Sequence, residues 1–198
     1  MTATVDALRI EPTRRRTYST AWWGMATLVM TEAMIFLILL AAALFLRASS
    51  SEWPPAGVEL PDLAKAIPFS IVLWASSIPI FVAEARLREG DIRTCRVALA
   101  VSFVLGAAFL TYTVTDFRDL HYGWRDHAYG SVFYVIVGLH ALHVAVGLVM
   151  SAFVQLKAAL GRYDATHHAS AQVYFLYWHF VDVVWVFVFA VLIVGPHL

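Results

Sequence analysis

The run AWWGMATLVMTEAMIFLILLAAALFL, residues 21–46, decides the fold, because its 26 residues carry one charged side chain, that of Glu32. An α-helix rises about 1.5 Å per residue, and about 20 mostly apolar residues are enough to cross the hydrocarbon core of a bilayer. The run is longer than the apolar core of a cleaved signal peptide, which has about 7–15 residues. We therefore expect a retained membrane-spanning helix.

Further runs of this kind follow at residues 67–85, 97–115, 131–156 and 172–194. The connections between the runs are too short to form separate domains. Charged residues make up 14% of the chain, against about 25% in a typical soluble domain. We predict an all-α polytopic membrane helix bundle, with a cytoplasmic N-terminal tail at residues 1–20 and a five-helix transmembrane domain at residues 21–198.

The distribution of charge predicts the orientation and excludes some functions. Ten of the 14 Lys and Arg residues lie in the N-terminal tail and in the second and fourth connections, which share one side of the membrane. Positive residues favour the cytoplasmic side, so we expect the N-terminus inside and the C-terminus outside. The net charge of zero gives no basic stripe for nucleic acid. The single cysteine, Cys95, rules out a disulfide framework and a Cys-rich metal site.

Five polar side chains fall within the apolar runs, namely Glu32, His140, His143, His179 and Asp182. A charged side chain at mid-bilayer costs at least about 2.5–3.5 kcal/mol, so such residues face the bundle interior and take partners. His179 and Asp182 share a helix face, and we expect Asp182 to accept the ring N–H of His179. We expect Glu32 to be neutral, with one of the three histidines or a lipid headgroup as its partner.

Three interpretations of these residues stay open: a structural network joining helices, a lipid or proton site, and a metal or haem site. Zinc and iron sites use His and carboxylate ligands, but the Glu-x-x-His pair of di-iron bundles does not occur in the sequence. A haem would need axial histidines on facing helices, for which His143 and His179 are the candidates. A transporter using Glu32 and Asp182 is disfavoured, because no apolar run looks broken in its middle. Gly138 and Gly147 predict close helix packing.

Several motifs resemble one known family. The run YWHFVDVVW, residues 177–185, looks like the last-helix signature of subunit III of haem–copper terminal oxidases, the cytochrome c oxidase subunit 3 family. Residues 129–134 and 138–144 resemble the penultimate-helix motif of that family, and residues 31–36 resemble the segment that carries its intramembrane carboxylate. Trp53-Pro54-Pro55 stands where the family often has such a turn. The motifs occur in family order and cover nearly the whole chain.

Three departures from the family pattern accompany the resemblance. The chain is similar to the short five-helix form, which lacks the first two helices of the longer members. Gln172 occupies the position, seven residues before His179, where the family often has an acid. Any role tied to that acid is therefore in doubt. Ala141 replaces the usual glycine that follows the first histidine of the His-x-x-His pair.

The resemblance implies a non-catalytic core subunit of a bacterial respiratory cytochrome c oxidase, a proton-translocating enzyme of the plasma membrane. Haem and copper are then expected in partner subunits I and II, and no cofactor in this chain. Bound phospholipid and support of proton uptake are implied too, with cytochrome c or a cytochrome bc-type complex reached through the partners. An equivalent subunit of a quinol oxidase or a nitric oxide reductase accessory protein stays open. Outside the family, a small haem-binding membrane cytochrome is the alternative.

Overall fold

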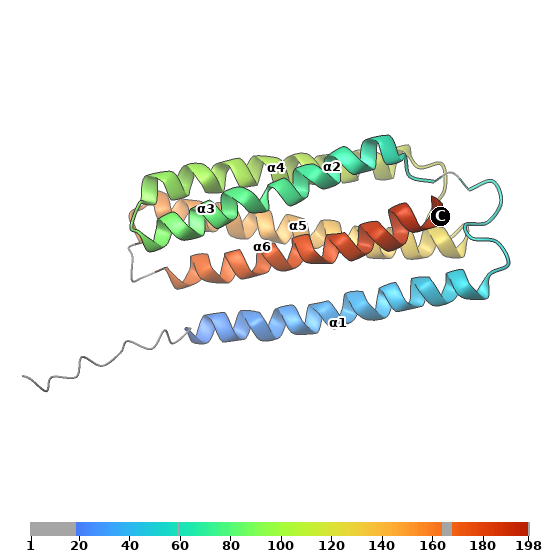
Figure 1. Cartoon of the computed structure of the whole chain (residues 1–198), viewed down its shortest axis with the longest axis horizontal. Coiled ribbons are helices and arrows are strands. Elements are labelled where there is room, and N and C mark those ends of the chain that lie inside the picture. Colours follow the sequence, from blue (N-terminus) through green and yellow to red (C-terminus); the bar gives the residue numbers. More distant parts are fainter. Residues whose placement is uncertain (1–18, 59, 164–167, 198) are drawn as a thin grey trace, which may run out of the picture.

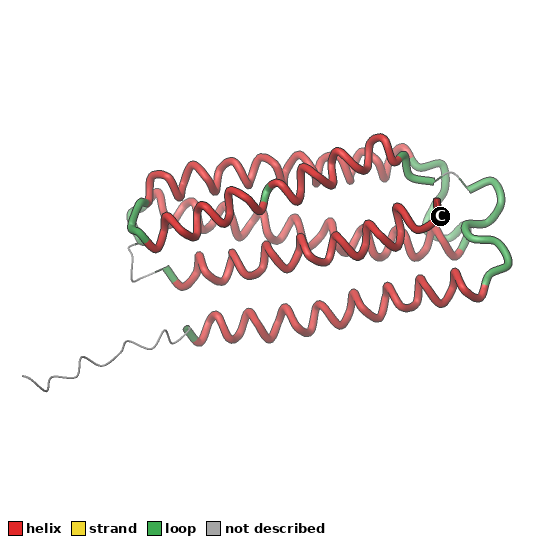
Figure 2. Tube along the Cα trace, in the orientation of Figure 1, coloured by secondary structure: helices red, strands yellow, loops and turns green. Residues whose placement is uncertain are grey.

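The computed structural model describes residues 19–58, 60–163 and 168–197. Helices, turns and loops account for all of these residues, and no strand occurs among them (Figure 2). Five helical spans are long and apolar enough to cross a membrane, and they lie side by side with the start of the first span and the end of the last at opposite ends of the bundle (Figure 1). The predicted all-α, five-span fold is confirmed. Residues 1–18 of the predicted tail lie outside the described residues.

The helices begin and end several residues beyond the apolar runs. In chain order they are α1 (Thr20–Ser49), α2 (Leu63–Ala75), α3 (Ser77–Arg88), α4 (Ile92–Asp119), α5 (Ala128–Ala159) and α6 (Ala169–Val188), the last continued by η2 (Phe189–Val194) and η3 (Gly195–His197). Capping explains the added turns at the starts. The side chains of Asp62 and Asp91 accept hydrogen bonds from the backbone N–H groups of Ala64 and Thr94. Such caps satisfy donors that an α-helix leaves open in its first turn.

The second span is divided into α2 and α3 at Ser76, and Figure 2 shows the short interruption. The expectation that no span is broken in its middle was wrong here. Pro79 supplies the physical reason, because a proline inside a helix lacks the N–H group and its ring collides with the carbonyl four residues earlier. That carbonyl belongs to Ala75, the last residue of α2.

The indole of Trp178 in α6 lies fully buried at the centre of the bundle. A Cβ atom on Gly106 of α4 would lie 2.6 Å from Cη2 of this ring, and one on Gly147 of α5 would lie 2.8 Å from Cε3. The two glycines therefore form the notch that admits the indole, as expected for Gly147. Gly138 does not have the predicted packing role, because a Cβ there would meet its nearest neighbour, Phe117, at an ordinary 3.8 Å.

The two most buried spans are α5 and the one that begins with α6. α6 contacts α1, α3 and α5, and α5 contacts α1, α4 and α6. α1 lies at the edge of the bundle (Figure 1), and its buried residues are Phe36, Leu40 and Ala43. Met25, Val29, Ala33, Leu39 and Leu46 are partly buried against the core, and most of the remaining apolar side chains of α1 face outward. In a bilayer this exposure carries no hydrophobic penalty, because lipid tails are as apolar as the side chains.

The glycine notch predicts which glycine tolerates a methyl group. We expect Gly106→Ala or Gly147→Ala to lower the free energy of unfolding by about 1–3 kcal/mol, the usual cost of overpacking a filled core. Gly138→Ala is the matched control, with little effect expected. Thermal denaturation of the purified protein in detergent, followed by circular dichroism, measures the difference. Equal stability of the three variants would contradict the notch.

Candidate functional site

The five intramembrane polar residues form separate contacts rather than one cluster. Glu32 of α1 meets His143 of α5, with 3.3 Å between Oε2 and Nε2. His179 and Asp182 of α6 both meet Ser77 of α3. Each of the five side chains, including His140, makes a hydrogen bond to a helix other than its own.

Aromatic side chains surround the ring of His143 on two sides. Phe36 of α1 packs edge-on, with ring centroids 5.2 Å apart, and Phe180 of α6 packs edge-on at 6.2 Å. Tyr177 of α6 lies nearly parallel to the imidazole at 6.3 Å, and its hydroxyl donates to the backbone carbonyl of His143 at 3.2 Å. These contacts fix the orientation of the imidazole, so its Nε2 atom points at Glu32.

The tautomer of His143 follows from its second hydrogen bond. Nδ1 lies 2.8 Å from the carbonyl oxygen of Leu139, one turn earlier in α5. A carbonyl only accepts, so Nδ1 carries a proton. In a neutral imidazole Nε2 then has a free lone pair, to which a protonated Glu32 carboxyl would donate its O–H. Transfer of a proton from the Glu32 carboxyl to Nε2 of His143 would give an ion pair of carboxylate and imidazolium. Both of these charges would have to be desolvated, which is costly. The neutral state of Glu32 stays a prediction.

Ser77 stands between His179 and Asp182, so the expected direct contact between these two residues was wrong. The Ser77 hydroxyl donates to Oδ2 of Asp182, and its oxygen lies 3.3 Å from Nδ1 of His179, from which it accepts. The imidazole of His179 stacks on Phe81 of α3, with ring centroids 4.3 Å apart. This stacking turns the imidazole ring toward α3. The spacing of the two residues on α6 predicted a direct hydrogen bond from His179 to Asp182, but the Ser77 hydroxyl lies between them and bonds to both.

His140 is 1% exposed and joins α5 to α6. Its Nε2 lies 3.3 Å from the backbone carbonyl of Val181, to which it donates. The ring packs between Trp185, with centroids 4.6 Å apart, and Phe109, at 5.9 Å. His140 faces the middle of the bundle, whereas His143 faces α1, although the two residues stand three apart on α5.

Three serines of the second span were missed by the sequence reasoning. Besides Ser77, Ser76 accepts from the indole N–H of Trp178, and Ser70 accepts from that of Trp185, both at 3.0 Å. Serine is common in transmembrane helices, where it hydrogen-bonds across interfaces. The signal that was available is the Ser76-Ser77 pair directly before a proline-containing turn.

The arrangement offers little to a metal or a haem. Within residues 19–58, 60–163 and 168–197, no group of three or more His, Cys, Asp or Glu side chains is placed to hold a metal ion. The haem alternative needs His143 and His179 to face a common space. Instead His143 is turned to Glu32 and His179 to Ser77 and Phe81. What these contacts do is join helices and keep one carboxyl group inside the membrane.

Comparison with known proteins matches the chain to one family over nearly its whole length. A family model described as Cytochrome c oxidase subunit III matches residues 16–195. The cytochrome c oxidase subunit 3 of Thermostichus vulcanus is 32% identical over 170 residues, covering 85% of this chain and 84% of that protein. The probable cytochrome c oxidase subunit 3 of Mycobacterium bovis is 33% identical over 173 residues, covering 85% of each chain. For the Sus scrofa subunit 3 the identity is 33% over 138 residues, 69% of this chain and 53% of that protein.

The relay through Ser77 predicts a specific loss of stability. Ser77→Ala removes the donor to a buried carboxyl oxygen, and an unsatisfied buried polar group costs about 1–3 kcal/mol. We expect the melting temperature of the purified protein in detergent to fall. Ser50→Ala is the control, because the exposed Ser50 hydroxyl bonds only within its own helix, to the carbonyl of Leu46. A Ser77→Ala protein as stable as this control would remove Ser77 from the network.

The expectation that the Glu32 carboxyl is neutral predicts selective chemical labelling. A hydrophobic carbodiimide needs lipid access and a protonated acid, and Glu32 has 27% of its side chain exposed. Glu84 and Glu89 form ion pairs with Arg88 and Arg86 outside the apolar part of the bundle. We expect label on Glu32 and not on these two, measured by peptide mapping of treated membranes. Glu32→Gln is the control that abolishes the label, and label confined to Glu84 and Glu89 would refute a lipid-accessible neutral acid.

Proposed function

The chain belongs to the cytochrome c oxidase subunit III family, and from this membership we propose that it is the non-catalytic subunit III of a respiratory haem–copper oxidase. It works with the other oxidase subunits, and subunits I and II are its proposed direct partners. In this proposal they hold the haem and copper, reduce oxygen to water and translocate protons. The observation that carries the proposal is the family match over residues 16–195.

The internal contacts support a structural rather than a chemical role for this subunit. All five intramembrane polar residues make hydrogen bonds that link one helix to another. A nucleophile, a general base or a metal ligand needs a free reactive atom beside a substrate or an ion. Here the polar atoms at Glu32, His143 and Ser77 are used between helices, which holds the bundle in one shape for its partners.

Lipid binding is proposed for the outward side of the Glu32–His143 pair. Glu32 is partly exposed, and Leu28 and Ile35, four residues before it and three after it, are 46% and 44% exposed. Residues at these spacings share a helix face, so the carboxyl group opens onto an apolar strip of α1. A phospholipid lying along this strip would shield the pair from water and keep Glu32 neutral.

The proposed setting is the plasma membrane of a bacterium, with the N-terminus inside. The end of α3, the start of α4, the end of α5 and the start of α6 share one end of the bundle with the start of α1 (Figure 1). Residues 86–96 and 157–162 at this end, taken together with the N-terminal tail, hold ten of the 14 Lys and Arg residues, the bias that favours the cytoplasmic side. Through its partners the subunit would serve an oxidase that takes electrons from cytochrome c or a cytochrome bc-type complex.

Removing this chain from the oxidase tests the proposal. We expect the complex without it to retain its haem and copper centres and to reduce oxygen at first. Proton uptake then slows, or activity decays during turnover, because the catalytic subunit has lost its neighbour and bound lipid. Oxygen consumption recorded over successive turnovers, with the chain restored as control, measures this. Loss of the haem–copper centres on deletion would instead assign an assembly role.

A further inference from the structure

Three hydroxyl groups form a layer one helical turn away from the indole of Trp178, on the side of the start of α4. Ser102 of α4 and Ser151 of α5 each lie four residues from a glycine of the notch, and Tyr174 lies four residues before Trp178 on α6. Residues at this spacing share a helix face. The contacts between α4, α5 and α6 that meet at the indole therefore continue into a layer whose side chains carry hydroxyl groups.

All three side chains of the layer are enclosed, and Ser102, Ser151 and Tyr174 are each 0% exposed. The two serines are close enough to the Tyr174 hydroxyl to act on it. In the described part of the chain, however, no direct hydrogen bond reaches the hydroxyl oxygen of Tyr174 or that of Ser102. A polar group without a partner is costly in the interior of a membrane protein. These two oxygens therefore call for a partner between them.

Ser102 also differs from three threonines farther along α4. These residues donate to backbone carbonyls three or four residues earlier, and they are Thr111, Thr113 and Thr115. Such a bond is the usual way in which a hydroxyl inside a helix finds an acceptor. The Ser102 hydroxyl makes no bond of this kind within the described residues, so its O–H group is available to the space that it shares with Tyr174.

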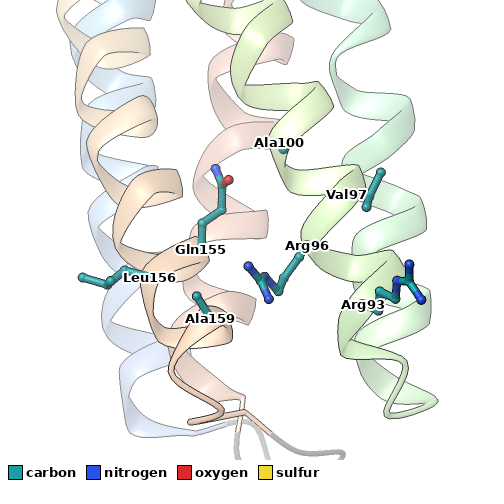
Figure 3. A pocket seen from close by; sticks show the side chains of 7 residues that line it. All are labelled: Arg93, Arg96, Val97, Ala100, Gln155, Leu156 and Ala159. Carbon is teal, nitrogen blue, oxygen red and sulfur yellow. The ribbon is translucent and has the colours of Figure 1, made fainter.

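A groove of about 480 Å³ approaches the layer from the end of the bundle that carries the start of α4. Arg96 and Ala100 line the groove from α4, and Gln155 lines it from α5. Figure 3 shows the side-chain amide of Gln155 between the levels of Arg96 and Ala100. The Nε2 atom of Gln155 donates to the hydroxyl of Ser151 at 3.2 Å. The Gln155 amide therefore connects the groove with the layer of hydroxyl groups.

We propose that the layer binds a water molecule, held by the hydroxyls of Ser102, Ser151 and Tyr174, and that this water exchanges with solvent through the groove. A buried water typically makes about three hydrogen bonds to polar groups that lack other partners. Three hydroxyls supply that number, and each can donate or accept. The water joins α4, α5 and α6 beside the glycine notch. The site does not depend on the proposed oxidase function.

X-ray radiolytic footprinting of the complete complex in detergent tests the site, because ionisation of a bound water produces a hydroxyl radical that oxidises the side chain beside it. We expect oxidation of Tyr174, located by peptide mapping and mass spectrometry. Tyr129 is the matched control, because it is also 0% exposed but its hydroxyl donates directly to the carbonyl of Leu192 at 3.1 Å. Tyr129 should stay unmodified. Equal modification of the two tyrosines, whether high or low, would overturn the water site.

Removal of one partner of the water should reduce the effect. We expect Ser102→Ala to lower the oxidation of Tyr174 to the level of Tyr129, because the water loses one of its three hydrogen bonds. Ser50→Ala is the control, since the Ser50 hydroxyl is exposed and bonds within its own helix, and it should leave the oxidation of Tyr174 unchanged. Oxidation of Tyr174 that persists in Ser102→Ala would contradict the proposed three-hydroxyl site.

The route through the groove is tested by repeating the footprinting after mixing with water that carries a heavy oxygen isotope. The isotope content of oxidised Tyr174 then reports how fast the bound water is replaced. We expect Gln155→Leu to slow the replacement, because it removes the amide between the groove and Ser151. Gln172→Leu is the matched control, since that amide contacts His168 and does not line the groove. Equal exchange rates in the two variants would overturn the route.

Discussion

The indole of Trp178 is the contact on which the arrangement of the bundle depends. It occupies a notch made by Gly106 and Gly147, which brings α6 against both α4 and α5. Its N–H group donates to Ser76, at the point where the second span is interrupted. A single side chain thus sets two helix separations by its shape and the position of a further span by its polar atom. Without the notch, Cβ atoms would lie closer to the ring than van der Waals contact permits.

The hydrogen bonds inside the bundle follow from the absence of water in the hydrocarbon layer, because each unpaired polar group there is costly. In this chain the intramembrane polar residues bond to helices other than their own: Glu32 with His143, Asp182 with Ser77, and His140 with the carbonyl of Val181. These bonds serve as directional links, since packing between apolar surfaces is nearly isotropic and lipid competes for it. A subunit built this way has a fixed shape, which suits a protein that works beside catalytic partners.

The spans and the five intramembrane polar residues were predictable from sequence, because a 20-residue apolar run has few alternatives in a membrane protein. The partners of those residues were not. Three histidines competed for Glu32, and only the rotation of α5 and α1 about their axes selects His143. The part played by Ser77 depends on the break before Pro79, which sequence reasoning read as a continuous helix. Gly138 and Gly147 look alike in sequence, and only the ring of Trp178 distinguishes them.

The hydrogen bonds from α6 to Ser70, Ser76 and Ser77 fix more than the distance between two helices. They pin the axial position of the second span, so that it cannot slide along α6 by one turn, ~5.4 Å, without breaking all of them. A single helix in a bilayer of unsuitable thickness relieves the mismatch by tilting or shifting. In this bundle the second span cannot shift along α6 in this way. Its apolar belt therefore has one height, and the surrounding lipid must thin or thicken to meet it.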